Sequence, residues 1–406
     1  MHRDRSNGWL LGVTFSALVI GLVLTGAGCD DAPSGPGTDP PGSRTPEVRW
    51  TQDLKHDEID GTQPLLLDGV AYVLADHFLF AFDAESGERL WRSRELLSEG
   101  GFFTEQVLHD DGRLFVKDAT IFWAFDRSSG NVLWQMFIPD FKPGDDFLTQ
   151  TEDYLYAGGH QELAQVDKDN GDVVNRFDVG TDLPDSIRHA VNQPILGPEG
   201  LLYLPTSFSR ETVDGQEGRM HAFDPATGTI EWTYTPEGRW LTAGNDSIRT
   251  NTWIHGGAIS QNLIVFPTGQ SIIALDRQTG EQQWRQFYPD DGFDFPPTVK
   301  DGVVYAGSIG ENVYALDLQT GEQLWRTKTR GSVSTFLTAR DGTVYFCNWS
   351  GGELWMLDAK SGEVLWHSYP PEFSNDRSFT YLSHLGVGED HMAVVGSKKI
   401  YGLTRP

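Results

Sequence analysis

The chain has 406 residues, of which 38% are hydrophobic, 22% are charged and only two are cysteines. This composition excludes a disordered chain, a collagen-like chain, a disulfide scaffold and a polytopic membrane protein. Acidic residues outnumber basic ones by 58 to 31, which gives a formal net charge of −27. Binding to a nucleic-acid backbone or to anionic lipid headgroups needs a basic surface, so we expect neither.

Residues 1–28 have the pattern of an export signal. Arg3 and Arg5 precede an apolar run from Trp9 to Leu24, and small residues then lead to Cys29. This is the order of a secretory signal peptide, and a cysteine directly after the small residues resembles the lipobox of bacterial lipoproteins. The resemblance implies that Cys29 is lipidated and becomes the first residue of the mature chain. The alternative is an uncleaved membrane anchor, because the apolar run is nearly long enough to span a bilayer.

Residues 29–46 are rich in proline, glycine and serine, and none of them is large and apolar enough to build a core. We therefore expect a flexible tether. In both interpretations of the N-terminus the bulk of the protein lies outside the cytoplasm. The expected location is the bacterial cell envelope, with the membrane reached only through a lipid anchor.

Residues 47–406 contain an internal repeat. Each copy ends in Asp, three residues, Gly, three residues and Trp, and most copies lie 41 to 43 residues apart. The tryptophans of this repeat are Trp50, Trp91, Trp134, Trp232, Trp284, Trp325 and Trp366. Its glycines are Gly87, Gly130, Gly171, Gly228, Gly280, Gly321 and Gly362. The copy at Gly171 has Asn175 in place of Trp. An eighth copy is divided between the two ends of the segment, around Trp50 and around Ile400.

The repeat predicts the fold. Each copy has nearly continuous apolar runs separated by turn residues, which is typical of short strands with both sheet faces covered. One such sheet cannot cover itself, but a ring of sheets can. We therefore predict an all-β, eight-bladed β-propeller of four-stranded antiparallel blades, closed by strands from both termini. The final Trp would wedge between neighbouring blades, Asn175 would mark a weak junction, and Phe177 would partly substitute there.

The repeat resembles the pyrroloquinoline-quinone-type propeller repeat, over nearly the whole mature chain. One branch of that family comprises quinoprotein dehydrogenases, which hold a quinone and Ca²⁺ at the ring centre. The other branch is non-enzymatic and includes lipoproteins of the outer-membrane β-barrel assembly machinery. A lipobox, a tether and a ring are all that the second branch requires, so the resemblance to it is the closer one.

The enzymatic branch requires features that this sequence lacks. Its alcohol-oxidising members use a vicinal cysteine pair, whereas Cys347 is alone in an apolar strand and is expected to be a buried structural thiol. No motif for Ca²⁺ ligands is found, and the segment from Asp167 to Asp172 is interpreted as the turn of the repeat rather than a calcium loop. We therefore expect no catalytic residues, no metal site, and neither quinone nor Ca²⁺ as cofactor.

Two insertions hold the candidate ligand pocket. Residues 182–198 and 240–257 each contain a Ser-Ile-Arg triplet, expected in equivalent places before an innermost strand, so that both would converge on one mouth of the central channel. The candidate residues are Arg188, His189, Asn192, Arg249, Asn251, Trp253 and His255. Such arginines, histidines and amides suit an anionic or polar ligand. The alternative is that they bond loop backbone and neighbouring acids.

These observations favour a monomeric, non-enzymatic envelope lipoprotein that binds an envelope protein as a scaffold, in outer-membrane protein assembly. Two alternatives stay open. One is a quinone- and Ca²⁺-dependent oxidoreductase. The other is a propeller that binds a sugar or polymer at the mouth formed by Arg188 and Arg249.

Overall fold

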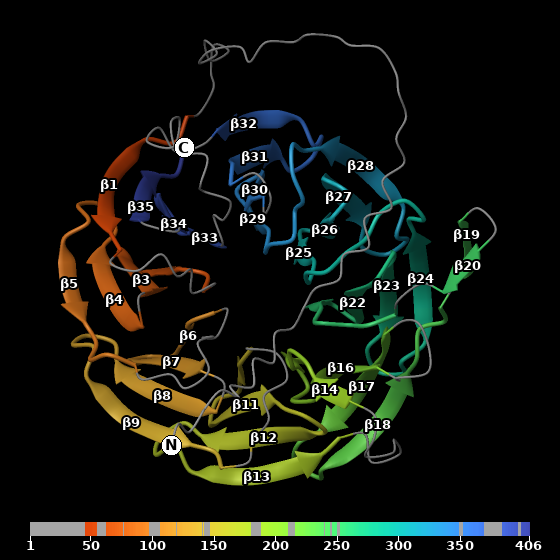
Figure 1. Cartoon of the computed structure of the whole chain (residues 1–406), viewed down its shortest axis with the longest axis horizontal. Helices are drawn as coiled ribbons and strands as arrows, with labels where there is room; N and C mark the ends of the chain where they lie inside the picture. Colours follow the sequence, from red (N-terminus) through yellow and green to blue (C-terminus); the bar gives the residue numbers. More distant parts are fainter. Residues whose placement is uncertain are drawn as a thin grey trace, which may run out of the picture. The chain divides into compact units, whose positions relative to one another are not determined.

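Consecutive strands of the chain pair into eight antiparallel sheets, which are arranged as blades around a ring (Figure 1). The fold is therefore the eight-bladed β-propeller that the repeat predicts, formed within the unit Ser43–Pro406. The computed structural model describes residues 45–54, 62–75, 77–96, 106–118, 120–139, 141, 147–179, 188–209, 216–238, 240–243, 246–249, 252–348, 352–368, 384–396 and 399–406. Within these ranges no helix is long and apolar enough to cross a membrane.

The blades are numbered in chain order, and each is given from its innermost to its outermost strand. Blade 1 contains β2 (Leu65–Leu67), β3 (Val70–Ala75), β4 (Phe78–Asp83) and β5 (Arg89–Arg92). Blade 2 contains β6 (Leu108–His109), β7 (Arg113–Asp118), β8 (Ile121–Asp126) and β9 (Val132–Phe137). Blade 3 contains β10 (Thr149–Gln150), β11 (Tyr154–Gly158), β12 (Glu162–Asp167) and β13 (Val173–Asp178). Blade 4 contains β14 (Arg188–Val191) and β15 (Ile195–Leu196), which both pair with β16 (Leu202–Ser209), then β17 (Gln216–Asp224) and β18 (Thr229–Tyr234).

A separate hairpin, β19 (Trp240–Ala243) and β20 (Asp246–Arg249), follows blade 4. Blade 5 contains β21 (Ala258–Ser260), β22 (Leu263–Thr268), β23 (Ser271–Asp276) and β24 (Gln282–Phe287). Blade 6 contains β25 (Thr298–Lys300), β26 (Val303–Gly307), β27 (Asn312–Asp317) and β28 (Gln323–Lys328). Blade 7 contains β29 (Thr338–Arg340), β30 (Thr343–Cys347), β31 (Leu354–Asp358) and β32 (Val364–Ser368). Blade 8 contains β33 (His384–Val387), β34 (His391–Val395), β35 (Lys399–Thr404) and β1 (Val48–Asp53).

Burial explains the apolar runs of the sequence. The second and third strands of each blade are covered on both faces, and every residue of β22 is buried. Outer strands such as β9 alternate between exposed and half-buried residues, as expected of a sheet edge with one face on a neighbour. The core is consequently a series of layers between blades, such as the one in which Ile272 and Ala274 pack with Val304 and Tyr314.

Six of the repeat tryptophans join their blade to the next by a hydrogen bond. In each of the six, the indole Nε1 donates to the carbonyl oxygen of the residue after the repeat Asp of the following blade. The pairs are Trp50–Ala84, Trp91–Arg127, Trp134–Lys168, Trp232–Arg277, Trp284–Leu318 and Trp325–Ala359, at 2.9 to 3.1 Å. The repeat glycine of that same turn lies against the indole ring. The predicted wedge is therefore both an apolar contact and a directed hydrogen bond.

The junction between blades 3 and 4 differs, as the sequence predicts. Asn175 donates through Nδ2 to Oε1 of Gln165 in its own blade, at 2.6 Å. Phe177 takes the place of the indole and is the nearest side chain to Gly228 of the next blade. Its ring also packs against Phe223, with centroids 5.0 Å apart. Asn175 thus closes its own blade, and Phe177 makes the contact between blades.

The ring is closed by the two ends of the repeat segment. β1 pairs antiparallel with β35, so that Trp50 lies opposite Gly402 and Asp53 lies opposite Lys399. The backbone N–H of Glu47 also donates to Oγ1 of Thr404, a residue 357 positions later. Blade 8 is therefore built from both termini, which leaves no open seam between blades.

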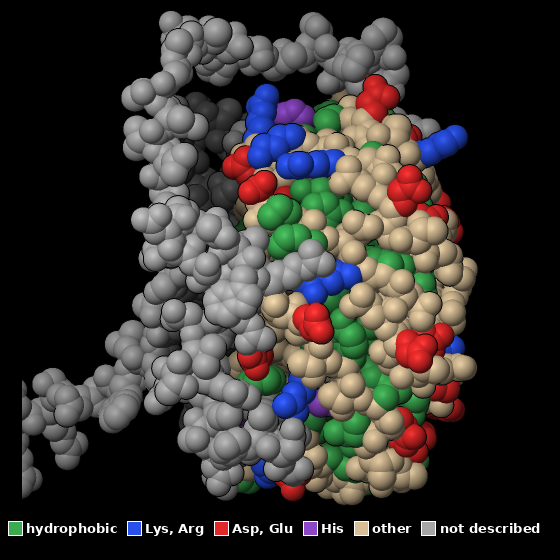
Figure 2. All heavy atoms as spheres, turned by 90° about the vertical axis from the view of Figure 1, so that its right-hand side faces the viewer, with side chains coloured by type: hydrophobic (Ala, Val, Ile, Leu, Met, Phe, Trp, Pro, Cys, Tyr) green, Lys and Arg blue, Asp and Glu red, His purple; other side chains and the backbone are tan. Residues whose placement is uncertain are grey.

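The two faces of the ring have different chemistry. On the first, which we call the turn face, the turn after the innermost strand lies beside the repeat turn of the same blade, as in the hydrogen bond from Leu318 N to Gly302 O. These turns are acidic, and Asp68, Asp301 and Asp341 adopt positive φ values of 49 to 51° in them. Figure 2 shows both acidic and basic side chains distributed over the side of the ring that it presents. The opposite face, which we call the loop face, carries the connections between blades.

Candidate functional site

In blades 1 to 7, one position just before the innermost strand lies near the centre of the ring. Strand pairing puts Leu65, Leu108 and Thr149 in register with Tyr72, Phe115 and Tyr156, and the same register holds in blades 4 to 7. Two residues before this position the chain enters the centre of the ring. The residues there, which we call the axial layer, are Gln63, Gln106, Phe147, Gln193, Gly256, Pro296 and Phe336. The repeat thus brings together side chains that are far apart in the sequence.

Phenylalanines of the axial layer meet across the ring. Phe147 precedes blade 3 and Phe336 precedes blade 7, and these blades lie on opposite sides of the ring (Figure 1). Their ring centroids are nevertheless only 6.0 Å apart, in an edge-to-face arrangement. Phe295 packs edge-on against Phe336 from blade 6, at 5.4 Å. Aromatic side chains therefore cross the channel and hold Phe336 in a defined position.

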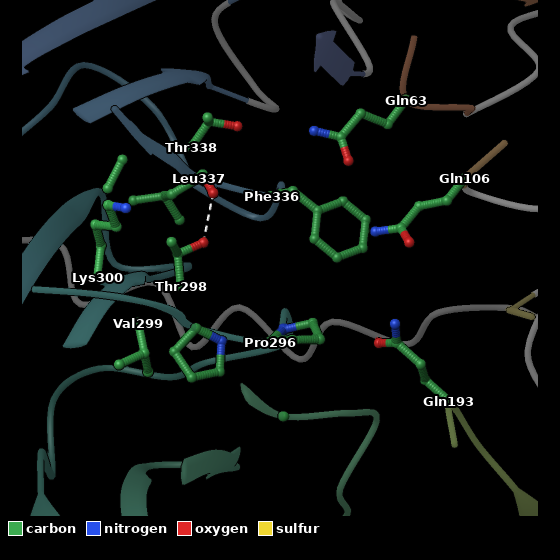
Figure 3. Close-up of a pocket in the computed structure, with 13 residues that line it drawn as sticks. Gln63, Gln106, Gln193, Pro296, Thr298, Val299, Lys300, Phe336, Leu337 and Thr338 are labelled. Carbon is green, nitrogen blue, oxygen red and sulfur yellow. Dashed lines mark hydrogen bonds between the residues drawn. The ribbon is translucent and has the colours of Figure 1, made fainter. Parts of the chain in front are cut away.

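A cavity of about 410 Å³ lies beside these phenylalanines. Its polar lining includes Gln63, Gln106, Gln193, Thr298, Thr338 and Lys300, and its apolar lining includes Phe336, Leu337, Pro296 and Val299. Figure 3 shows the amide groups of the three glutamines facing Phe336 and Pro296 from one side. The glutamines come from blades 1, 2 and 4, whereas the residues opposite come from blades 6 and 7. With Gly257 from blade 5, the cavity is assembled by six blades of the ring.

One wall of the cavity is closely packed. A Cβ added at Gly256 would lie 2.5 Å from Oε1 of Gln193 and 2.8 Å from Cγ of Pro296, so only glycine fits between them. The backbone N–H of Gln193 also donates to His255 O at 3.1 Å. Oε1 of Gln193 is buried and has no hydrogen-bond partner. The side chain of Gln193 is therefore held in place by its packing against Gly256.

Many backbone carbonyls beside the cavity are already satisfied by side chains of neighbouring blades. Gln63 donates through Nε2 to Leu385 O at 3.0 Å. Thr298 donates through Oγ1 to Leu337 O, a bond drawn in Figure 3. Thr149 makes the same kind of bond to Pro194 O. These backbone carbonyl oxygens are therefore not available to a ligand. A ligand in the cavity would form hydrogen bonds mainly with side chains.

The cavity is almost uncharged. Lys300 is the charged residue among those that line it, and none of those residues is a carboxylate. In the part of the chain that the structure describes, no group of three His, Cys, Asp or Glu side chains could hold a metal ion. Burial raises the pKa of the nearby Asp294 carboxyl, and the charge of His255 opposes this increase. The chemistry available in the cavity is thus hydrogen bonding and apolar contact.

Three residues of the predicted pocket lie close to one another. Asn192 donates through Nδ2 to Ser207 Oγ at 2.7 Å and to Ile254 O, so both of its donor hydrogens are used within the protein. The rings of Trp253 and His255 are 4.3 Å apart in an edge-to-face pair. The chain continues directly from Asn192 to Gln193 and from His255 to Gly256 of the axial layer. These residues therefore support the cavity wall.

The arginines of the two Ser-Ile-Arg triplets lie in strands with different partners. Arg188 and His189 lie in β14, which pairs with the C-terminal half of β16. Arg249 lies in β20, which pairs only with β19 among the described strands, and Figure 1 shows this hairpin at the outer rim of the ring. Asn251 lies outside the described residues, as does Cys29. The placement of the arginine side chains at the channel mouth stays a prediction.

Two structural interpretations of the sequence are confirmed. Cys347 is 1% exposed, and burial raises the pKa of its thiol to about 12. Asp167 accepts hydrogen bonds through Oδ1 from the backbone N–H groups of Asp169 and Asn170. Cys347 is thus a buried structural thiol, and Asp167 closes the repeat turn.

Sequence reasoning missed the three glutamines of the cavity. Glutamine has no motif of its own, and these residues are 43 and 87 positions apart in the sequence. A usable signal existed in the repeat register, because each glutamine stands two residues before the innermost strand of its blade. Aligning the copies on their inner strands would have shown the layer, whereas aligning them on the final Trp did not.

Comparison with known proteins agrees with this architecture. A family model described as outer membrane protein assembly factor BamB matches residues 43–234, 159–286 and 268–403. The crystal structure of BamB from Moraxella catarrhalis has a TM-score of 0.61 and 14% identity, covering 89% of this chain and 98% of that one.

Quinoprotein dehydrogenases are similar as well. A europium-containing methanol dehydrogenase has a TM-score of 0.65 and 14% identity, covering 89% of this chain and 94% of that one. The quinoprotein ethanol dehydrogenase of Pseudomonas aeruginosa is 29% identical over 279 residues, which are 58% of this chain and 41% of the dehydrogenase. The match thus spans less than half the length of this curated relative. At 14% identity the structural likenesses show the fold alone.

Proposed function

Because this chain belongs to the family of the outer membrane protein assembly factor BamB, we propose that it is a non-enzymatic envelope lipoprotein. It binds another envelope protein as a scaffold, in the assembly of outer-membrane proteins. The observation that carries this proposal is the family match over nearly the whole ring. The family indicates an envelope-associated protein that works through contacts with other proteins.

The chemistry of the channel supports a non-enzymatic role. A quinone cofactor with Ca²⁺ needs several oxygen ligands for the ion, carboxylates among them, and basic groups for its own carboxylates. The residues that line the axial cavity include one lysine and no carboxylate. They do not fit this cofactor, and we derive no reaction step through it. The proposal is that the protein works without quinone or calcium.

The loop face supports a partner surface. The described strand ends that flank residues 182–187, 210–215 and 369–383 lie on this face. Ile309, in the turn between β26 and β27, is 49% exposed there. Loops that a rigid scaffold positions are the usual carriers of binding. The partner therefore docks on the loop face, and the acidic turn face stays in solvent.

Photocrosslinking within one blade tests this orientation. Ile309 and Asp301 lie at opposite ends of β26 and are both exposed. A photoreactive residue in place of Ile309 is expected to give a discrete adduct with one membrane protein in native envelopes. The same residue in place of Asp301 is the matched control and is expected to give none. Equal adducts from both positions would contradict docking on the loop face.

The enzymatic alternative has its own test. Purified protein is mixed with pyrroloquinoline quinone and Ca²⁺, and both its melting temperature and its reduction of an artificial electron acceptor are measured. A ligand that binds the folded state raises the melting temperature, so no shift and no reduction are expected. A stabilisation accompanied by acceptor reduction would show that the protein is an oxidoreductase.

The lipid anchor is part of the proposal. Cys29 carries the lipid, and residues 29–46 tether the ring to the membrane. A Cys29→Ser variant is expected to leave the membrane fraction, while the melting temperature of its ring stays that of the wild type. A wild-type protein whose mass includes residues 1–28 would instead support the uncleaved anchor.

A further inference from the structure

We infer that the axial cavity binds a neutral, polyhydroxylated chain, which is a short oligosaccharide. This inference concerns the channel and not the loop face, so it stands independently of the scaffold role. It rests on three observations. The cavity has an amide-rich lining, it has an aromatic wall that is held in place, and the neighbouring backbone is capped.

The amide lining matches hydroxyl groups. A glutamine amide offers two donor hydrogens and an acceptor oxygen, and a sugar hydroxyl both donates and accepts. Gln106 makes no side-chain hydrogen bond in the described part of the chain, and Gln193 also lines the cavity, although its Oε1 is packed against Gly256. Thr338 adds a hydroxyl from the opposite wall. Ligand hydroxyls would satisfy these groups, whereas an apolar ligand would leave them unpaired.

The aromatic wall matches the carbon skeleton of a sugar. Phe336 lies opposite Gln106 in the cavity (Figure 3). Its position is determined by edge-on contacts with Phe295 and Phe147, at 5.4 and 6.0 Å. A fixed aromatic ring can pack against the C–H groups of a sugar ring without a further loss of side-chain entropy. The cavity therefore contacts both the polar and the apolar parts of such a ligand.

A peptide added as a strand fits this site less well. Strand addition requires free backbone N–H and C=O groups along a sheet edge. The carbonyl oxygens of Leu337, Leu385 and Pro194 beside the cavity are already occupied by Thr298, Gln63 and Thr149. Recognition must therefore come mainly from side chains, which favours a ligand with many hydroxyl groups.

Charge excludes most ionic ligands. A polyanion is usually held by several Arg or Lys side chains, and a cation by carboxylates. The lining has Lys300 alone and no carboxylate. The volume of about 410 Å³ lies within the range of about 300–1,000 Å³ that small-molecule sites occupy. The cavity thus has the size and neutrality expected of an oligosaccharide site.

Titration calorimetry tests the inference on the full chain, purified in a detergent without a sugar headgroup. The probes are maltotriose, cellotriose and tri-N-acetylchitotriose. At least one is expected to bind with a Kd of about 1 mM or tighter. Gln106→Ala and Gln193→Ala are each expected to weaken that binding about three- to tenfold, through the loss of one or two hydrogen bonds.

The matched control is Gln283→Ala, because Gln283 is an exposed glutamine on the outer strand β24. It is expected to bind the sugar as the wild type does. Melting temperatures are recorded for all variants. If Gln193→Ala does not fold, Gln106→Ala carries the test, because its amide supports no other residue in the described structure.

Several outcomes would overturn the inference. One is that none of the three sugars binds at about 10 mM, well above the Kd of a weak complex. Another is that a sugar binds equally well to both glutamine variants. Binding of trialanine instead of the sugars would identify a peptide site. Binding of trigalacturonate alone, lost in Lys300→Ala, would identify an anion site. All these results leave the crosslinking test of the scaffold role unaffected.

Discussion

Gly321 lies directly against the indole of Trp284 in the preceding blade, so that a Cβ added at Gly321 would fall 2.6 Å from Trp284 Cδ2. The same turn accepts the hydrogen bond of that indole through Leu318 O, at 2.9 Å. The conserved spacing of Asp, Gly and Trp within the repeats is thus explained by a contact between repeats. The glycine of one blade makes room for the tryptophan of the blade before it.

Gly321→Ala and Gly228→Ala form a matched pair that separates backbone strain from collision. The φ values are +71° and +73°, so the strain of adding a Cβ is about 1 kcal/mol in both variants. At Gly228 the nearest atoms belong to Phe177 and are 3.5 Å away. Gly321→Ala is therefore expected to lose about 1–3 kcal/mol more than Gly228→Ala, measured by urea unfolding. Equal losses would show that the wedge tolerates a methyl group.

Asn175→Trp is expected to destabilise the ring unless Gln165 is changed as well. In most blades the Trp lies opposite Ala or Gly, as Trp325 lies opposite Ala315, whereas Asn175 lies opposite the buried Gln165. An indole at position 175 would remove the hydrogen bond from Asn175 and leave Oε1 of this buried glutamine without its donor. The double variant Gln165→Ala/Asn175→Trp is expected to be more stable than the sum of the single changes predicts.

A double-mutant cycle measures this coupling. Contacting residues usually show coupling energies of about 0.5–3 kcal/mol, and a favourable value in this range is expected for Gln165 and Asn175. A coupling energy near zero would mean that the two substitutions act independently. In that case the standard Ala–Trp pair could not be rebuilt in blade 3.

Trp325→Ala is expected to lose about 3–5 kcal/mol of stability. Trp325 is 8% exposed, and its Nε1 donates to Ala359 O at 3.1 Å. Trp325→Phe keeps most of the apolar contact and removes the hydrogen bond, so it is expected to lose less. Tyr305 also donates to Ala359 O, which leaves that carbonyl with one partner in both variants. Thermal melts of both variants that match the wild type would show that this indole does not join blades 6 and 7.

The repeat turns are expected to make the ring sensitive to acid. A hydrogen bond from the Ser86 side chain lowers the pKa of Asp83, one from the Thr320 backbone lowers that of Asp317, and one from the Ser361 side chain lowers that of Asp358. A carboxyl whose pKa is lower in the folded state than in the unfolded state stabilises the protein at pH values above the unfolded-state pKa, which is about 3.9 for Asp. This stabilisation is lost as the pH falls through the folded pKa.

Thermal melts between about pH 6 and pH 2 measure this effect. The melting temperature is expected to fall below about pH 4, and Asp317→Asn is expected to make the fall shallower because the amide does not titrate in this range. A melting temperature that rose on acidification would contradict the lowered pKa values of these turns.

The fold could be predicted from the sequence because its physical cause is local and repeated. The Asp-Gly-Trp spacing places the same turn and wedge in each copy, and even the exception at Asn175, with Phe177 as substitute, follows from the pattern. The ring closure by Trp50 and Ile400 also follows, since each half-copy lacks what the other supplies. These features depend on residue identity within one repeat length.

The site could be predicted less well because it depends on which residues of each blade reach the central axis of the ring. Asn192, Trp253 and His255 do not line the axial cavity, whereas Gln193, the sequence neighbour of Asn192, does. The cavity combines segments from six blades, and the residues of its axial layer share a register position but no chemical type. A search for unusual chemistry in insertions selects charged residues and passes over glutamines.

The pairing of β1 with β35 makes the order of synthesis matter. Val48 to Asp53 are synthesised before the rest of the ring, yet their hydrogen-bonding partners are Lys399 to Leu403, near the end of the chain. The backbone groups of the first strand therefore have no partner strand for as long as the chain is incomplete. Blade 8, and with it the closed circle, can form only after the last strand has been synthesised.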